Sequence, residues 1–293
     1  MRLVLLCCVF VLSWLSTAQA DKVRAVATIS IIGDVVRNVA GDAIDLTVFV
    51  GPDGDAHEFE PTSEDIVILS KADILFENNL HLEHWLDKIF AASASKAKRV
   101  VVSAGVVPLT LENNPLETDP HAWQDVANVV VYVQNVRDAL SALDPAHKAT
   151  FETNAAGYIA QLKGLDQWVQ AQLALVPAEH RNLVTNHDAL GYFARRYGFR
   201  IIGAVIPSAT TEAADPSARA TARLLEIIKA NGVHAIFPEN MANARIARSI
   251  SDEAGIVVAP GLYTDALGVR GSDGETYIRM IRHNVGVVLE YLK

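Results

Sequence analysis

The sequence predicts an α/β protein in which two lobes with mostly parallel sheets are joined by one long rigid helix. Short runs rich in valine and isoleucine alternate with segments of helical periodicity in both halves of the chain. Such alternation is typical of parallel sheets covered by helices. Between the halves, apolar residues recur at helical spacing from Phe151 to Leu173. A helix of about 30 residues would run for roughly 45 Å there, and we expect it to act as a strut.

The patterns divide the chain into an N-terminal lobe (residues 21–143), the linking helix (144–176) and a C-terminal lobe (177–293). Asp144 can cap the linking helix, with Pro145 at its first position. The predicted strands are Lys22–Thr28, Ile44–Val50, Ile74–Glu77 and Arg99–Ser103, then Leu183–Thr185, Arg200–Val205, His234–Phe237 and Ile256–Ala259. The predicted helices are Ile29–Ala40, Ser63–Lys71 and His81–Ala92, then Ala189–Tyr197, Ser217–Asn231, Asn243–Ala254 and Gly274–Leu292.

The first twenty residues are expected to form a cleavable secretory signal. Arg2 precedes the apolar run Leu3–Leu15, and small residues lead to Ala20, as in signal peptides. The run is shorter than the roughly 20 residues that span a bilayer, which argues against a membrane anchor. Both cysteines, Cys7 and Cys8, lie in this segment, too early and in the wrong context for a lipoprotein cleavage site.

The remainder of the chain therefore offers neither disulfides nor thiolate metal ligands. Its net charge of −9 argues against a nucleic-acid partner, which requires a basic surface. Half of the 293 residues are apolar, enough to bury a large core.

Four side chains that can bind a metal follow predicted strands, where open α/β sheets place their ligand sites. They are His57, His121, His187 and Asp265, two from each half. Three neutral imidazoles and one carboxylate satisfy tetrahedral zinc. Taken singly, each histidine also fits a surface or hydrogen-bonding role, and Asp265 fits a turn cap. The spacing alone leaves both interpretations open.

Five longer motifs follow in order along the chain, and four of them contain these residues. They are Asp55-Ala56-His57-Glu58-Phe59-Glu60-Pro61-Thr62, Asp119-Pro120-His121-Ala122-Trp123, His187-Asp188-Ala189-Leu190-Gly191-Tyr192-Phe193, Phe237-Pro238-Glu239-Asn240 and Leu262-Tyr263-Thr264-Asp265. Together they resemble the metal-binding solute receptors of bacterial zinc and manganese ABC importers, the cluster A-I type. The resemblance covers essentially the whole chain after residue 20.

This resemblance implies a single zinc ion in the cleft between the lobes, bound by His57, His121, His187 and Asp265. It implies a monomeric periplasmic protein, not an enzyme, that delivers zinc to the membrane permease of an ABC importer. The manganese-type receptors carry a carboxylate where this chain has His187, and imidazole suits zinc whereas manganese prefers oxygen donors. The manganese receptor of the same family stays as the alternative.

One segment departs from the family pattern. Many zinc receptors have a long loop rich in histidine before the second ligand, whereas Thr110–Thr118 is short and free of histidine here. The chain thus resembles the AztC-type receptors, for which a periplasmic zinc metallochaperone is an expected partner.

A zinc hydrolase is the less favoured alternative, with three histidines and an open fourth position. No His-Glu-x-x-His motif occurs in the sequence, and Asp265 is available to fill that position. Carboxylates beside the proposed ligands are expected to orient the imidazoles, and Glu239 would replace Asp265 if the latter were not a ligand. These carboxylates are Glu58, Glu60, Asp188 and Glu239. His81 and His84, one helical turn apart, are expected on a solvated face.

Overall fold

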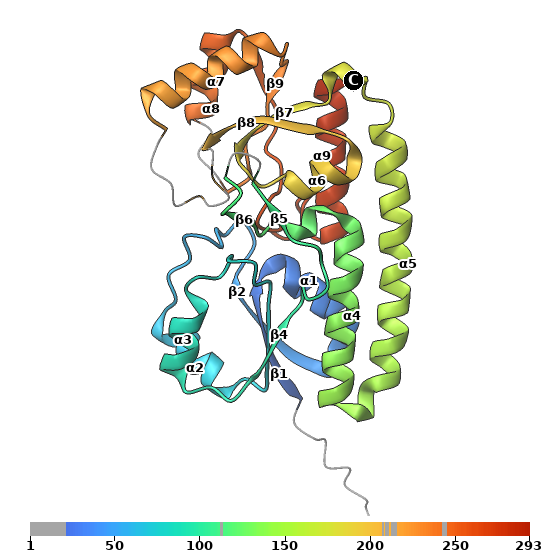
Figure 1. The fold of residues 1–293 in the computed structure, drawn as a ribbon. Helices are drawn as coiled ribbons and strands as arrows, with labels where there is room; N and C mark the ends of the chain where they lie inside the picture. Colours follow the sequence, from blue (N-terminus) through green and yellow to red (C-terminus); the bar gives the residue numbers. More distant parts are fainter. Residues whose placement is uncertain (1–21, 112–113, 207, 209–210, 212–215, 242–244) are drawn as a thin grey trace, which may run out of the picture.

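The computed structural model shows two lobes stacked beside a pair of long helices (Figure 1). It describes residues 22–111, 114–206, 208, 211, 216–241 and 245–293. The expected signal segment, residues 1–20, lies outside the described residues. Among those that are described, no helix combines the length and the apolar character needed to cross a membrane.

The N-terminal lobe is built on a four-stranded parallel sheet with the strand order β2-β1-β3-β4. Its apolar strands are covered by helices, as the alternating pattern predicted. The strands are β1 (Val23–Ile29), β2 (Ile44–Val50), β3 (Ile74–Glu77) and β4 (Lys98–Val101). The helices are α1 (Ser30–Ala40), α2 (Ser63–Lys71) and α3 (Leu86–Ser93).

The C-terminal lobe repeats this arrangement. Two parallel strand pairs, β7 with β8 and β9 with β10, are joined by a parallel bridge between Thr185 and Phe237. The strand order is therefore β8-β7-β9-β10, the same pattern as in the first lobe. The strands are β7 (Asn182–His187), β8 (Arg200–Ile206), β9 (Ala235–Ile236) and β10 (Val257–Val258). The helices are α6 (Gly191–Tyr197), α7 (Ala218–Ala230), α8 (Arg245–Ala254) and α9 (Tyr277–Leu292).

Two helices, α4 (Val126–Leu143) and α5 (Lys148–Leu173), run side by side along the molecule (Figure 1). The sequence patterns indicated a helix after His121 but did not delimit α4. The expected strut is α5, which has 26 residues and is roughly 39 Å long. It begins three residues later than Pro145, because Asp144 caps a separate short 3₁₀ turn by accepting from His147 N.

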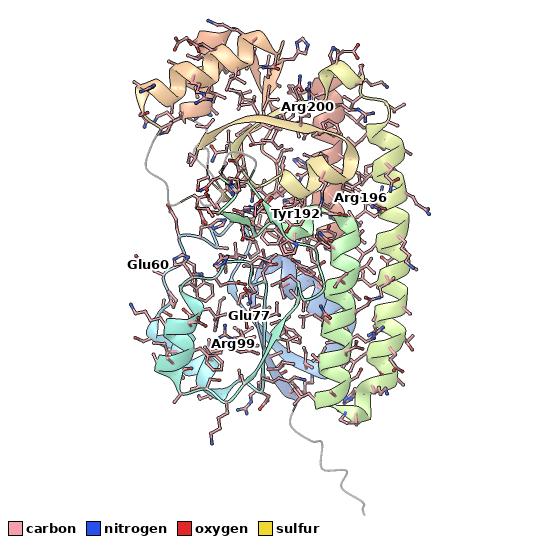
Figure 2. All side chains as sticks on the ribbon, in the orientation of Figure 1. Glu60, Glu77, Arg99, Tyr192, Arg196 and Arg200 are labelled. Atoms are coloured by element: carbon pink, nitrogen blue, oxygen red, sulfur yellow. The ribbon has the colours of Figure 1, made fainter. Side chains whose placement is uncertain are left out.

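Polar contacts fasten α5 to both lobes. On the N-terminal side, Tyr158 donates its hydroxyl to Asp34 Oδ2 of α1 at 3.0 Å. On the C-terminal side, Asp166 accepts hydrogen bonds from Arg196 and from the hydroxyl of Tyr197, both in α6; Arg196 is labelled beside α5 in Figure 2. Because a single helix is bonded to both lobes, α5 has the geometry of the strut that the sequence predicted.

A short antiparallel hairpin, β5 (Leu109–Thr110) with β6 (Thr118–Asp119), lies between the lobes (Figure 1). The backbone N–H of Leu109 donates to the hydroxyl of Tyr192 in α6 at 3.0 Å, and Tyr192 is labelled in Figure 2. The hairpin leads directly into the second predicted ligand segment and so attaches that segment to the C-terminal lobe.

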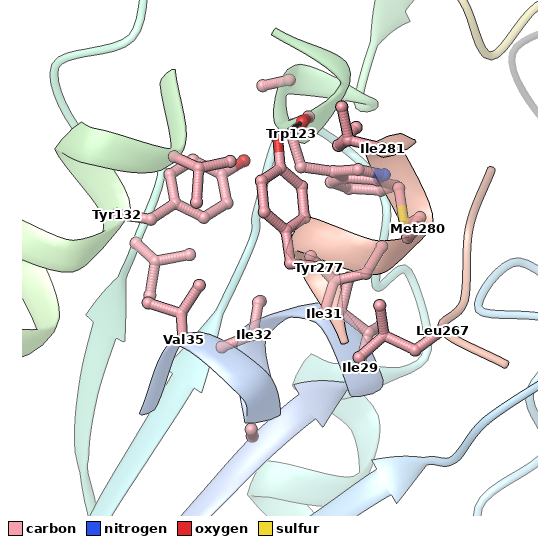
Figure 3. Packing of buried hydrophobic residues seen from close by; sticks show 14 of the residues in the cluster. Ile29, Ile31, Ile32, Val35, Trp123, Tyr132, Leu267, Tyr277, Met280 and Ile281 are labelled. Carbon is pink, nitrogen blue, oxygen red and sulfur yellow. Dashed lines mark hydrogen bonds between the residues drawn. The ribbon is translucent and has the colours of Figure 1, made fainter. Parts of the chain in front are cut away.

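One apolar core extends through the N-terminal lobe, α4, α5 and α9. Figure 3 shows its centre, where Trp123 and Tyr277 pack above Ile29 and Ile32. The hydroxyl of Tyr277 donates to the carbonyl of Trp123 at 2.6 Å. A smaller second core fills the C-terminal lobe between its sheet and α7 and α8. The larger core therefore holds the second ligand segment against the last helix.

Most predicted strands and helices are present, some with the predicted ends and most others with ends that differ by at most three residues. The predicted helix His81–Ala92 is the largest discrepancy, because α3 begins only at Leu86. Three consecutive residues, Asn79, Leu80 and His81, have φ values of 66°, 54° and 69°, which no right-handed helix accommodates. Glu83 stabilises this turn by accepting from Asn79 N at 2.9 Å.

Replacing Tyr158 with Phe should destabilise the protein by about 1–3 kcal/mol, because the buried Asp34 would lose a hydroxyl donor. Burial already raises the pKa of Asp34, against the hydrogen bonds from Tyr277 and Tyr158, which lower it. Urea unfolding of metal-free protein measures the loss. Tyr291→Phe, at a partly exposed position in α9, is the control. An unchanged midpoint for the Tyr158 variant would show that the contact contributes nothing.

Candidate metal centre

The structure brings the four predicted ligands together between the lobes. His57 lies in the loop after β2, and His121 lies just before a 3₁₀ turn that follows β6. His187 is the last residue of β7, and Asp265 lies in the loop after β10. All four are buried, with at most 2% of any one exposed. The carboxyl ends of two parallel sheets therefore face a common point, as expected for ligand sites in open α/β sheets.

The Nε2 atoms of the three imidazole rings all face this common point. The Nε2 atom of His121 lies 3.3 Å from Nε2 of His57 and 3.2 Å from Nε2 of His187. The Asp265 Oδ2 atom lies 3.4 Å from the Nε2 atoms of both His57 and His187. Its Oδ1 atom lies 3.3 Å from Nε2 of His121. One donor atom from each residue falls within 4.8 Å of all the others.

These separations match the edges of a small tetrahedron. In a regular tetrahedron the corners are about 1.63 times as far apart as each is from the centre, so metal–ligand bonds of about 2.0–2.1 Å separate the donors by about 3.3–3.4 Å. The measured separations of 3.2–3.4 Å agree with this value. The donor groups are thus close enough together to bind one divalent cation.

Asp265 is a buried carboxylate whose oxygens have no conventional hydrogen-bond partner, only the facing imidazoles. Burial by itself raises the pKa of this carboxyl, but the charges of His187 and His121 and a hydrogen bond from His57 outweigh it, and the net pKa is lowered. Asp265 is therefore ionised. Its unshared oxygen lone pairs are directed at the place where a cation would sit.

Two of the imidazoles contact a carboxylate through Nδ1, on the side of the ring that faces away from the common point. Asp119 Oδ1 lies 2.7 Å from Nδ1 of His121 and also accepts from its backbone N–H at 2.9 Å. Glu239 lies 2.7 Å from Nδ1 of His187 and accepts from its backbone N–H at 2.9 Å. With Nδ1 occupied in this way, each ring turns Nε2 toward the centre, the arrangement in which a carboxylate orients a metal-binding histidine.

The first ligand is fixed through its backbone. Asp55 Oδ1 accepts from the N–H of His57 at 2.8 Å, and its other oxygen accepts the hydroxyl of Thr211 at 2.7 Å. Trp85 donates its indole N–H to the carbonyl of Ala56 at 3.0 Å. The loop after β2 is thereby tied to both lobes.

His187 carries a raised pKa of about 10 in the metal-free protein. Burial lowers the pKa, but the negative charges of Glu239 and Asp265 outweigh that effect. At neutral pH this imidazole is therefore protonated when no metal is present. A metal ion must displace that proton to use Nε2.

The carboxylates that flank the proposed ligands in sequence differ in their exposure and in their contacts. Glu239 was considered as a substitute for Asp265, but it orients His187 from behind. The side chains of Glu58 and Glu60 are exposed, and Glu60 lies at the outer edge of the molecule in Figure 2. His81 and His84 are not part of any cluster of three or more potential ligands among the described residues.

Two carboxylates that orient ligands, Asp55 and Asp119, were not identified from the sequence. Each lies two residues before its histidine, and an aspartate at that spacing commonly accepts from the backbone N–H two positions later. The repeated Asp-x-His pattern is the signal that could have indicated them.

Comparison with known proteins places this geometry in a family. Residues 25–290 match the family model described as "Zinc-uptake complex component A periplasmic", ZnuA. The chain belongs to this family, which comprises metal-binding solute receptors of ABC importers.

Relatives that are named for different metals resemble this chain in sequence or in structure. The chain is 34% identical to the manganese-binding lipoprotein MntA of Halalkalibacterium halodurans over 270 residues, 92% of this chain and 88% of MntA. It is 33% identical to the iron-binding protein YfeA of Yersinia pestis over 271 residues, 92% of this chain and 86% of YfeA. The solved structure of the periplasmic zinc binding protein TroA from Treponema pallidum superposes with a TM-score of 0.86 at 32% identity, covering 92% of this chain and 99% of TroA.

Replacing Asp119 with Asn should weaken metal binding roughly 10- to 100-fold, because His121 would lose the carboxylate that sets its ring orientation. Competitive titration against a chromophoric chelator measures the change in affinity. Glu58→Gln removes a neighbouring exposed carboxylate and should bind like the parent. Equal losses in the two variants would mean that net charge, rather than orientation, accounts for the effect.

Proposed function

We propose that this protein captures one zinc ion in the cleft between its lobes and delivers it to the membrane permease of an ABC importer. The observation that carries the proposal is the donor set: three imidazoles and one carboxylate, all buried, with five N···N and N···O separations of 3.2–3.4 Å and all donor atoms within 4.8 Å of one another. Tetrahedral coordination by nitrogen and oxygen at these separations is the geometry that zinc favours.

The choice of zinc rests on His187. Imidazole suits zinc, whereas manganese is better served by oxygen ligands, and here the position holds an imidazole oriented by Glu239. The similarity to TroA, named for zinc, is in line with this choice. The names of MntA and YfeA, for manganese and iron, show that family membership by itself does not select the metal.

Manganese is the second candidate, and one observation favours it. Both oxygens of Asp265 face the imidazoles, Oδ1 toward His121 and Oδ2 toward His57 and His187. A carboxylate that binds through both oxygens would provide a fifth ligand, and manganese prefers oxygen donors. Competition between the two metals therefore decides the assignment.

A reversible receptor is better supported than a zinc hydrolase. A hydrolytic site keeps one coordination position open for water, whereas Asp265 lies at 3.3–3.4 Å from the three imidazoles and can fill it. The named relatives are binding proteins and importer components.

The remaining parts of the proposal concern location and partners. We expect the protein to be exported through the signal at residues 1–20 and to be a monomer in the periplasm. We expect the exported chain to consist of an N-terminal lobe (21–143), a linking helix (144–176) and a C-terminal lobe (177–293). Several relatives are lipoproteins, whereas neither Cys7 nor Cys8 lies in a lipoprotein cleavage context here. A periplasmic metallochaperone is a proposed source of metal, since the segment before His121 is short.

Elemental analysis of protein purified without added metal, with competitive zinc and manganese titrations, tests the metal. The parent should bind one zinc ion more tightly than manganese, and His187→Ala should lose most zinc affinity because one of its nitrogen donors is removed. His180→Ala, a histidine outside the centre, is the control. Tighter manganese binding by the parent would replace zinc with the alternative, and an unaffected His187 variant would refute the ligand set.

Zinc affinity should fall as the pH is lowered. His187, with a pKa of about 10, is protonated throughout the range from pH 8 to 6, so each unit of pH decrease strengthens proton competition about tenfold. Asp265 stays ionised because its pKa is lowered and does not oppose the trend. We expect a loss of about 100-fold across this range, with about one proton released per ion.

Competitive titration at each pH measures the affinity, and calorimetry in buffers of different ionisation enthalpy counts the protons. Affinity that is constant between pH 8 and 6, with no proton release, would show that His187 is neutral in the metal-free protein.

A further inference from the structure

Thr264, immediately before the ligand Asp265, lies where three ligand segments meet. It is 1% exposed, and both its backbone carbonyl and its side-chain hydroxyl have partners. The carbonyl contacts the segment that follows His121, and the hydroxyl contacts the carboxylate that holds His187.

The carbonyl of Thr264 is held from the N-terminal side. The indole Nε1–H of Trp123 and the amide Nε2–H of Gln124 both donate to it, at 2.7 and 2.8 Å. Both donors are fully buried, and the Trp123 ring packs edge-on against the ring of His121 at a centroid distance of 5.4 Å. The Thr264 peptide therefore fixes the distance between the second and fourth ligands.

The hydroxyl of Thr264 acts on the third ligand. It donates to Glu239 Oε2 at 3.0 Å, while Glu239 Oε1 and Oε2 both lie 2.7 Å from Nδ1 of His187. A hydroxyl donor to one oxygen restricts rotation of the carboxylate and keeps it aligned with the imidazole. Hydrogen bonds to a charged group in such a dry site are stronger than those between neutral groups.

Asp265 depends on its backbone for orientation, because its carboxylate has no hydrogen-bond donor other than the imidazoles. Before Thr264 in the chain, the backbone of Tyr263 is bound by the side chain of Asn284 in α9. The amide of Asn284 accepts from the Tyr263 N–H at 2.9 Å and donates to the Tyr263 carbonyl at 2.7 Å. On the following side, Leu267 donates to Ser30 Oγ at 3.0 Å. Thr264 is the residue in this segment that contacts the segment after His121 and the carboxylate that holds His187.

We propose that Thr264 is a positioning residue that couples His121, His187 and Asp265, and that its hydroxyl slows release of the bound metal. Without the hydroxyl, Glu239 is held only by the ring and backbone N–H of His187, so the carboxylate is less restrained and aims Nε2 at the metal less precisely. This inference rests on the proposed metal-capture function. It concerns retention of the ion, which depends on the joint geometry of the ligands rather than on their identity.

The variant Thr264→Val tests the hydroxyl, because valine keeps the branched shape and removes only the donor. Protein loaded with one equivalent of zinc is mixed with excess EDTA, and the dissociation rate is measured by stopped flow. We expect release roughly 10- to 100-fold faster than from the parent. Thr264→Ser, which retains the hydroxyl, is the matched control and should release zinc at a rate close to that of the parent.

A purely structural role would lower the urea midpoint of the metal-free protein without changing the release rate of the folded protein. A parental rate for Thr264→Val, or equal acceleration in Thr264→Val and Thr264→Ser, overturns the proposal. Should Thr264→Val not fold, Gln124→Met removes one donor to the Thr264 carbonyl and must still accelerate release.

The same measurement on His187→Ala separates the two claims. If His187→Ala retains zinc as the parent does, the proposed site itself is wrong. If His187→Ala loses zinc while Thr264→Val releases it at the parental rate, only the role of Thr264 is refuted.

Discussion

Asp265 places a negative charge in the interior, and the arrangement around it follows from the need to stabilise that charge. An ionised carboxylate that is removed from water is costly unless it is paired, and its oxygens here face only imidazole nitrogens. In the metal-free protein, protonation of His187 supplies a compensating positive charge. A divalent cation can supply the same positive charge. The proton on His187 and the metal ion therefore compete for the same site.

The two sheets make this concentration of donors possible. Both have the same strand order. Of the proposed ligands, His57 and Asp265 lie in loops after parallel strands, His187 ends β7, and His121 follows the β5–β6 hairpin. The long helix α5 is hydrogen-bonded to α1 on one side and to α6 on the other. The long helix therefore links the two lobes directly through buried and partly buried hydrogen bonds.

Much of this architecture could be predicted from the sequence because it depends on local patterns. Apolar periodicity located most strands to within a few residues, and histidines after strand ends indicated where ligands would gather. The start of α3 was wrong because left-handed residues at 79–81, stabilised by Glu83, interrupt an otherwise helical pattern.

Contacts between distant residues could not be inferred in this way. The bond from Trp123 to Thr264 joins positions 141 residues apart, and nothing in the local sequence of either reveals it. Glu239 was recognised as a neighbour of the site, but its placement behind His187 depends on the pairing of β7 and β9 in space. Local patterns therefore indicated candidate ligands and the family resemblance favoured them, while the groups that orient them emerged only in three dimensions.

The bond between Leu267 and Ser30 has a consequence for how the centre is assembled. These residues are 237 positions apart, so the loop that carries Asp265 is tied in place by a residue near the other end of the described chain. Closing so long a loop costs conformational entropy, although the cost grows only slowly with length, and contacts of this range form slowly. The ability to hold an ion is thus a property of the completed chain, and a fragment that ended before Asp265 would lack both the fourth donor and the tie that positions it.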